Sequence, residues 1–259
     1  MGIVNVTPDS FSDGGLTFDR GEAVEQGLKF ADAGADILDI GGESTRPGSE
    51  PLGLQEELDR VIPVISALAK QVNIPLSIDT YKAEVARRAL DAGASIVNDI
   101  SAGYFDPQML ETISTGDAGA VLMHIQGTPR DMQRHPHYND VISEVRQFLV
   151  NAVAGCNEKG IARERILVDP GIGFGKTLEH NLSLLRNLDK FQDLGIGVLV
   201  GPSRKSFIGL LTERPVGERL EGTLAAVAAC ALGGVDVVRV HDVAQTIVAL
   251  KVADAIGRK

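Results

Sequence analysis

The sequence contains no tryptophan and only two cysteines, and aromatic residues make up 4% of its 259 positions. Cys156 and Cys230 lie far apart and have neither metal-binding nor redox spacing, which argues against a disulfide-stapled fold and a zinc module. Free thiols are typical of a reducing compartment, so we expect a cytoplasmic protein.

The chain also lacks long hydrophobic runs. Its most apolar segment, LAAVAACALGGVDVV from Leu224, meets Asp236 too early to span a bilayer. The N-terminus has no basic region ahead of an apolar one, and Val6 stands where a myristoylation signal needs Ser or Thr. We therefore expect neither a secretory signal nor a membrane anchor.

Positive charge is scarce, because 25 Lys and Arg against 35 Asp and Glu give a net charge of −10. This balance argues against a nucleic-acid or anionic-membrane surface. An anionic small molecule would need a local concentration of Arg and Lys. With 44% hydrophobic and 23% charged residues, the composition is that of an ordinary globular protein.

Short β-branched runs alternate with longer amphipathic segments along the whole chain. The runs predict eight strands, at 2–6, 36–40, 75–79, 95–99, 120–124, 165–169, 197–201 and 236–240. Each is apolar enough for a parallel strand buried on both faces. The segments between them predict helices, several of which end in Ala-Gly or Lys-Gly before the next strand.

Eight such units in about 250 residues favour one domain over 1–259, an α/β fold of the closed (β/α)8 TIM-barrel type. The alternative is an open doubly wound sheet, which normally carries G-x-G-x-x-G after its first strand. The turn here reads NVTPDSFSDGG and does not match. In a TIM barrel the site lies at the C-terminal ends of the strands.

The stretch DPGIGFGKT, which begins at Asp169, is close to a phosphate-binding P-loop. With Gly175, Lys176 and Thr177 aligned to the end of G-x-x-x-x-G-K-[ST], the first glycine falls one residue late, at Gly171. We therefore assign no phosphate to Lys176. Asp169, which ends the preceding strand, becomes the residue to explain.

Polar side chains stand at almost every predicted strand end. They are Asn5, Asp39, Asp79, Asn98, His124, Asp169, Ser203 with Lys205, and Arg239 with His241. Any one of them alone is an ordinary capping or turn residue. Together they converge on one mouth and must be desolvated there, which is typical of a functional site.

The mixture of groups indicates the ligand. Asp79, Asn98 and Asp169 suit a flat heterocycle with several N–H donors, because a carboxylate accepts two parallel N–H bonds from an amino-pyrimidinone edge. Lys205 and Arg239 supply positive charge, and Arg can also stack on an aromatic ring. The expected anion contacts are Thr45, Arg46, Ser203 and His241.

Two loops at the same end have a functional composition. The first, VTPDSFSDGG (6–15), is too long for a minimal strand-to-helix turn, and we expect a mobile lid. The second, GGESTRPGSEP (41–51), places Thr45 and Arg46 beside Pro47 and Gly48, which disfavour a helix. Solvated linkers are the alternative for both loops.

Other side chains give weaker signals. His135 and His137 are spaced like a metal pair, but no ligand cluster completes it, and we expect an exposed loop. Met123 and Phe174 flank the predicted mouth and fit either the core or a pocket wall. Ser203 lies in GPSRKS rather than G-x-S-x-G, so no Ser-His-Asp nucleophile is expected.

The motifs MGIVNVTPDSFSDGG, DIGGESTRPG, IDT, NDI, MH, DPGIGFGK, GPSRKSFIG and RVH occur in this order from Met1 to His241. In this they resemble the dihydropteroate synthase family. The resemblance implies a folate-biosynthetic transferase that joins 7,8-dihydropterin-6-ylmethyl diphosphate to 4-aminobenzoate, releasing pyrophosphate and 7,8-dihydropteroate. It also implies Mg²⁺, a homodimer, and sulfonamides as competitors of 4-aminobenzoate.

The resemblance further implies residue roles. The residues expected to hold the pterin are Asp79, Asn98, Asp169 and Lys205, and Met123 is expected among the substrate-binding residues. Those expected at the diphosphate are Arg239, which also stacks on the pterin, His241 and Asn5, which also contacts Mg²⁺. The 4-aminobenzoate side should comprise Thr45, Arg46, Pro47, Phe174 and Ser203, covered by the loop with Asp9, Ser10 and Phe11. Those expected to act in catalysis are Asp79, Lys205, Arg239 and Asp9.

The implied reaction is a dissociative displacement at the pterin methylene. Mg²⁺ and cationic groups stabilise the departing pyrophosphate, and Asp79 supports the positive charge that develops on the dihydropterin. A neutral arylamine needs no strong general base, which explains why no nucleophile–base pair is recognisable. We also expect ordered binding, in which the two loops complete the second pocket once the diphosphate is in place.

Two other functions on the same barrel are alternatives. A pterin-binding methyltransferase needs no diphosphate site, so Arg46, SRKS and Arg-Val-His argue against it. A non-catalytic homologue should have lost one of Asn5, Thr45, Arg46, Lys205 and Arg239, and all five are present. The family usually has a further segment before the first strand, whereas here Met1 opens that strand directly. If the chain begins there, we expect the barrel bottom to lack its usual cover.

Overall fold

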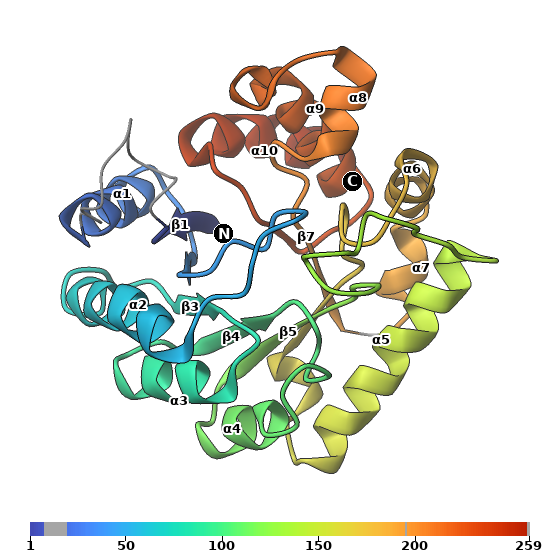
Figure 1. The fold of residues 1–259 in the computed structure, drawn as a ribbon. Coiled ribbons are helices and arrows are strands. Elements are labelled where there is room, and N and C mark those ends of the chain that lie inside the picture. Colours follow the sequence, from blue (N-terminus) through green and yellow to red (C-terminus); the bar gives the residue numbers. More distant parts are fainter. Residues whose placement is uncertain (8–19, 195, 258–259) are drawn as a thin grey trace.

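The computed structural model describes residues 1–7, 20–194 and 196–257. All eight predicted strands are present: β1 (Gly2–Asn5), β2 (Leu38–Gly41), β3 (Leu76–Asp79), β4 (Ile96–Asp99), β5 (Gly119–Met123), β6 (Ile166–Asp169), β7 (Gly197–Val200) and β8 (Val237–Val238). They are parallel and pair in sequence order. A parallel bridge between Gly2 and Val240 joins the last strand to the first, which confirms the (β/α)8 barrel (Figure 1).

Helices surround these strands (Figure 1). They are α1 (Arg20–Asp32), α2 (Leu54–Leu68), α3 (Ala83–Asp91), α4 (Met109–Thr115), α5 (Val141–Glu158), α6 (Leu178–Arg186), α7 (Asp189–Gln192), α8 (Ser206–Thr212), α9 (Leu220–Leu232) and α10 (Val243–Gly257). The predicted alternation is thus correct in outline, although β6 and β7 are each followed by two helices. No helix in the described part of the chain combines the length and hydropathy needed to cross a membrane.

The observed strand bounds differ most from the predicted ones at the last strand. The run 236–240 yields only the two residues of β8. The reason is a change of partner: Arg239 N–H still donates to Val200 O of β7, whereas Val240 N–H donates to Met1 O beside β1. The end of this segment therefore closes the barrel instead of extending the β7 ladder.

Alternation along the strands decides which side chains reach the barrel axis, because successive residues of a strand point to opposite faces. The inner core contains the buried Met1, Val121 and Leu199, with Ile37, Ile96, Leu167 and Val237 packed against them. The residues two positions further along these strands include Asp39, Asn98, Met123, Asp169 and Arg239. They follow the same inward face toward the C-terminal mouth, which brings polar groups from several strands together there.

Candidate active site

Arg239 joins two carboxylates at the barrel mouth. Its Nε donates to Asp39 Oδ2 and its Nη2 donates to Asp79 Oδ2, both at 2.5 Å. Asn98 Nδ2 donates to the same oxygen of Asp39 at 3.0 Å. Within the described part of the chain, no hydrogen bond engages the amide oxygen of Asn98 or Nη1 of Arg239.

Asp39 is more important than its sequence position indicated. We expected a polar strand-end residue and assigned it no role, but its side chain is fully buried beneath Arg239 and Asn98. It sits two residues after the inward-facing Ile37 of the inner core. Residues two positions apart along a strand face the same side, so the sequence could have shown that the carboxylate of Asp39 faces the barrel axis.

The carboxyl group of Asp79 has a pKa near neutral pH. Burial raises its pKa from the ordinary 3.8 to about 7, opposed by the positive charge of Arg239 and assisted by the negative charges of Asp39, Glu57 and Asp99. A carboxylic acid with this pKa loses its proton near neutral pH. The carboxylate that forms can stabilise a developing cation.

The turn after β6 explains the glycines of DPGIGFGKT. Asp169 is buried, and its Oδ1 accepts the N–H of Gly171 at 2.7 Å. Gly171 has a φ of +70°, and a Cβ there would lie 1.9 Å from the carbonyl oxygen of His124. Glycine is thus required for the turn that holds one carboxylate oxygen of Asp169. Burial also raises the pKa of Asp169.

Lys176 is a structural residue beneath this turn. It is buried, and its Nζ lies 2.9 Å from His124 Nδ1 and donates to Phe174 O at 2.9 Å. Burial lowers the pKa of Lys176 well below its ordinary value, and burial lowers that of His124 to about 3. These contacts agree with assigning it no phosphate.

Lys205 lies on the opposite side of the same turn. Its Nζ donates to Ile172 O and lies 4.1 Å from the centre of the Phe174 ring. Burial lowers its pKa to about 8, and the negative charge of Asp169 opposes that shift. Met123 is buried in a small cluster against which Phe174 packs. Lys205, Phe174 and Met123 thus form one wall of the mouth.

Ser203 and His241 form a hydrogen-bonded pair beside Arg239. Ser203 Oγ lies 2.9 Å from His241 Nδ1 and accepts the N–H of His241 at 3.2 Å. Burial lowers the pKa of His241 to about 4, and the charges of Arg239, Arg204 and Arg46 add to this effect. At neutral pH His241 therefore offers a hydrogen bond rather than a positive charge.

The second loop, 41–51, brings Arg46 toward this pair. Thr45 is half-buried, whereas Arg46 and Pro47 are exposed. The loop is tied across the mouth by the N–H of Gly48, which donates to Pro129 O at 2.9 Å. Asn5, at the end of β1, pairs in register with Gly41 at the start of this loop.

Some predicted residues are not part of this arrangement. Asp9, Ser10 and Phe11 lie outside the described residues. His135 and His137 are exposed in the loop before α5, as expected.

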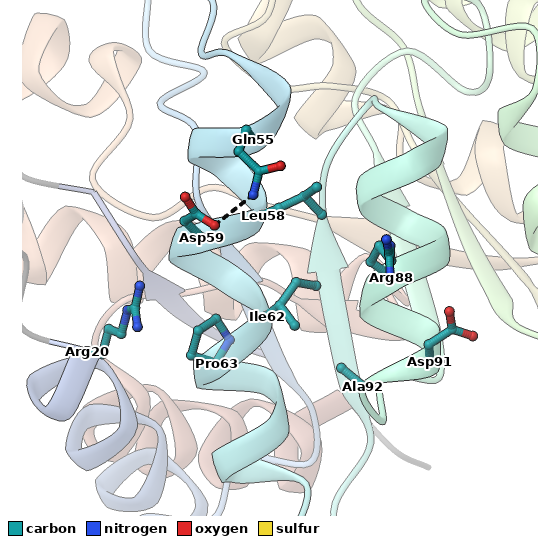
Figure 2. Close-up of a pocket in the computed structure, with 9 residues that line it drawn as sticks. All are labelled: Arg20, Gln55, Leu58, Asp59, Ile62, Pro63, Arg88, Asp91 and Ala92. Carbon is teal, nitrogen blue, oxygen red and sulfur yellow. Dashed lines mark hydrogen bonds between the residues drawn. The ribbon is translucent and has the colours of Figure 1, made fainter.

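A groove of about 540 Å³ lies elsewhere, among α1, α2 and α3 on the outer wall. Figure 2 shows Leu58, Ile62 and Pro63 of α2 between Arg20 and Arg88, and the groove contains none of the predicted site residues.

Known proteins resemble this chain along its whole length. The family model described as pterin binding enzyme matches residues 1–241. A dihydropteroate synthase of Synechocystis sp. is 50% identical over 259 residues, covering 100% of this chain and 90% of the relative.

Two solved structures are also similar. The Yersinia pestis dihydropteroate synthase, solved as a sulfonamide drug complex, has a TM-score of 0.94 at 42% identity, covering 98% of this chain and 92% of that one. The Xanthomonas albilineans enzyme, in complex with 7,8-dihydropteroate, has a TM-score of 0.89 at 44% identity, covering 100% and 93%.

Proposed function

We propose a residue-level mechanism from the premise that the chain belongs to the pterin-binding enzyme family and, within it, to the dihydropteroate synthases. The reaction condenses 7,8-dihydropterin-6-ylmethyl diphosphate with 4-aminobenzoate and yields 7,8-dihydropteroate and pyrophosphate. The Arg239 fork between Asp39 and Asp79 is the observation that carries the proposed mechanism, because it assembles acceptors and a cation at one mouth.

The pterin ring is recognised by the buried acceptors. Asp169 offers its second carboxylate oxygen and Asn98 its amide oxygen to the N–H groups of the ring. Lys205, whose Nζ contacts the same turn as Asp169, donates to a ring acceptor. Arg239, fixed at two points of its guanidinium, stacks on the ring and directs Nη1 to the diphosphate.

The diphosphate is held at the adjoining edge of the mouth. Arg239 supplies charge, and the neutral Ser203–His241 pair supplies hydrogen bonds. Asn5 fits a Mg²⁺ ligand, because its amide oxygen is a hard donor at the end of β1. Among the described residues, no group of three His, Cys, Asp or Glu could hold a metal ion. When bound, Mg²⁺ neutralises charge on the leaving pyrophosphate.

The chemical step is dissociative. As the bond from methylene carbon to diphosphate oxygen breaks, positive charge spreads into the dihydropterin, and ionised Asp79 lies at the mouth to stabilise it. The neutral amine of 4-aminobenzoate then forms the new C–N bond and releases its proton to solvent. Thr45, Arg46, Pro47 and Phe174 orient that amine, and sulfonamides compete for the same place.

The methyltransferase alternative explains fewer observations. It accounts for Asp79, Asn98 and Asp169. It does not account for Arg46, whose positive charge lies close enough to lower the pKa of His241. The Synechocystis relative, which is 50% identical, is also named a dihydropteroate synthase.

The test of the proposed function is pyrophosphate release measured with each component omitted in turn. Release should occur only when dihydropterin diphosphate, 4-aminobenzoate and Mg²⁺ are all present. Absence of turnover with all three would reject the proposal.

We also propose a cytoplasmic homodimer. Leu232 of α9 and Val248, Val252 and Ile256 of α10 are 54–70% exposed, and the three in α10 recur every four residues, which forms an apolar stripe. Such a stripe fits a self-complementary contact with a second copy. Light scattering should give a dimer mass for the wild type and a monomer mass for Val252→Glu. A wild-type monomer would overturn this proposal.

A further inference from the structure

A buried ionic cluster lies beside the site described above and includes Glu43 of the 41–51 loop. Lys82 Nζ donates to Glu43 Oε2 and to Glu57 Oε2, the latter at 2.5 Å. Tyr81 Oη donates to Glu43 Oε1 at 2.6 Å, and Thr80 Oγ1 donates to Glu57 Oε1 at 2.7 Å. The side chains of Glu43, Glu57 and Lys82 are only 7%, 1% and 18% exposed.

Glu57 occupies a position where the helix pattern calls for an apolar residue. It shares the buried face of α2 with Val61, Val64, Ile65 and Leu68. Burial raises the pKa of Glu57, which measures how strongly its charged form is disfavoured there. Hydrophobic replacements of buried ion pairs are often neutral or stabilising, so stability alone does not account for this cluster.

The cluster connects three parts of the molecule. Glu43 is the third residue of the 41–51 loop, Glu57 lies in α2, and Tyr81 and Lys82 follow Asp79 in the loop between β3 and α3. The preceding residue is fixed as well, because Arg60 Nη1 of α2 donates to Gly42 O at 2.9 Å. The backbone at 42–43 is therefore held by the scaffold, while Arg46, three residues later, is exposed.

We propose that Glu43 and Lys82 are positioning residues that set the path of the 41–51 loop and so aim Thr45 and Arg46 at 4-aminobenzoate. Neither residue touches substrate; they act through the loop backbone. The inference rests on the proposed function, because it assigns the loop to the 4-aminobenzoate side. It extends that function by locating the control of the second pocket in a buried cluster between β2, α2 and α3.

The test separates the two substrates. Lys82→Met removes the ammonium group that joins the two carboxylates. The KM for 4-aminobenzoate should rise about tenfold, because a small misplacement of orienting groups has effects of this size or larger. The Kd for dihydropterin diphosphate with Mg²⁺, measured calorimetrically without 4-aminobenzoate, should stay within about twofold. Lys82→Arg should restore most of the KM.

The matched control is Arg87→Met on α3, which breaks an exposed ion pair with Glu84 and should change neither constant. If Lys82→Met does not fold, Tyr81→Phe removes only the hydrogen bond to Glu43 and should raise the same KM with an unchanged Kd. An unchanged KM, or a KM and Kd that rise together, would overturn the positioning role. Wild-type turnover in the same assay shows that such a failure belongs to this inference and not to the proposed function.

Discussion

The pterin pocket and the 41–51 loop are built in opposite ways, although they form neighbouring parts of one mouth. Asp39, Asn98 and Asp169 are at most 5% exposed and are already hydrogen-bonded to protein groups. In the loop, Arg46 and Pro47 are exposed, and the nearby Arg130–Glu50 pair spans 3.5 Å with both side chains more than 60% exposed.

This difference follows from the elements that carry the residues. Strand ends inherit the rigidity of the barrel, so their side chains can be preorganised for a flat ring. The exposed tip of the 41–51 loop, at 46–48, has few buried contacts and can move at low free energy, although its start at 42–43 is anchored. The pterin pocket should therefore exist before substrate binds, whereas the second pocket should form with help from the bound diphosphate.

Replacement of the fork should have the largest effect. Arg239→Met leaves Asp39 and Asp79 without their counter-charge, and Asp39 Oδ1 already has no hydrogen-bond partner among the described residues. We expect a loss of about 3–5 kcal/mol in unfolding free energy by urea denaturation, together with loss of turnover. Arg186→Met, which breaks an exposed pair with Glu179, should cost less than about 1 kcal/mol. Equal losses in the two variants would contradict a preorganised pterin pocket.

Asp169→Asn should act on pterin binding with little change of fold. The Asn oxygen can still accept the Gly171 N–H, but an amide donor then faces the ring donors. Calorimetry should show weakening of dihydropterin diphosphate binding by about 2–3 kcal/mol, which is roughly 30–150-fold. Unchanged affinity would remove Asp169 from the pocket.

Activity should depend on pH through the pterin pocket, because Asp79 lies there. Below about pH 7 Asp79 gains a proton, so kcat/KM for the diphosphate substrate should fall as pH decreases. Asp79→Asn should abolish this acidic fall of the pH profile.

The contribution of Asp79 to stability should change with pH in the opposite direction. The folded pKa is raised, so the contribution of Asp79 is fully present below 3.8 and is lost as pH rises through about 7. Asp79→Asn should therefore gain stability relative to wild type between pH 5 and pH 8, and the opposite trend in urea titrations would refute the assignment.

The loop should give the smallest structural effect. Arg46→Ala removes an exposed side chain, and the unfolding free energy should change by less than about 0.5 kcal/mol. The KM for 4-aminobenzoate should nevertheless rise about tenfold, the loss typical of one hydrogen bond to a charged group. Steady-state kinetics and thermal unfolding of one preparation measure both. A large loss of stability would show that the loop is as rigid as the strand ends.

The sequence was sufficient for the barrel and for most residues at its mouth. β-Branched runs mark the strands. Because every second residue of a strand faces the barrel axis, the sequence then predicts that Asn98, Asp169 and Arg239 point inward. Pairing is not encoded locally, so the fork from Arg239 to Asp39, 200 residues away, needed the structure. Likewise, the sequence shows Glu57 as one charged residue in an amphipathic helix. Its part in the buried ionic cluster became visible only from its contact with Lys82 in the structure.

Binding of 4-aminobenzoate, measured by calorimetry with and without dihydropterin diphosphate and Mg²⁺, tests the contrast between the two regions most directly. Pyrophosphate with Mg²⁺ and a pterin can replace the diphosphate substrate, so that no turnover occurs during the titration. The account predicts that the pterin ligand binds to the free protein and that 4-aminobenzoate binds only after the anion is in place. Equal affinity for 4-aminobenzoate with and without the anion would contradict it.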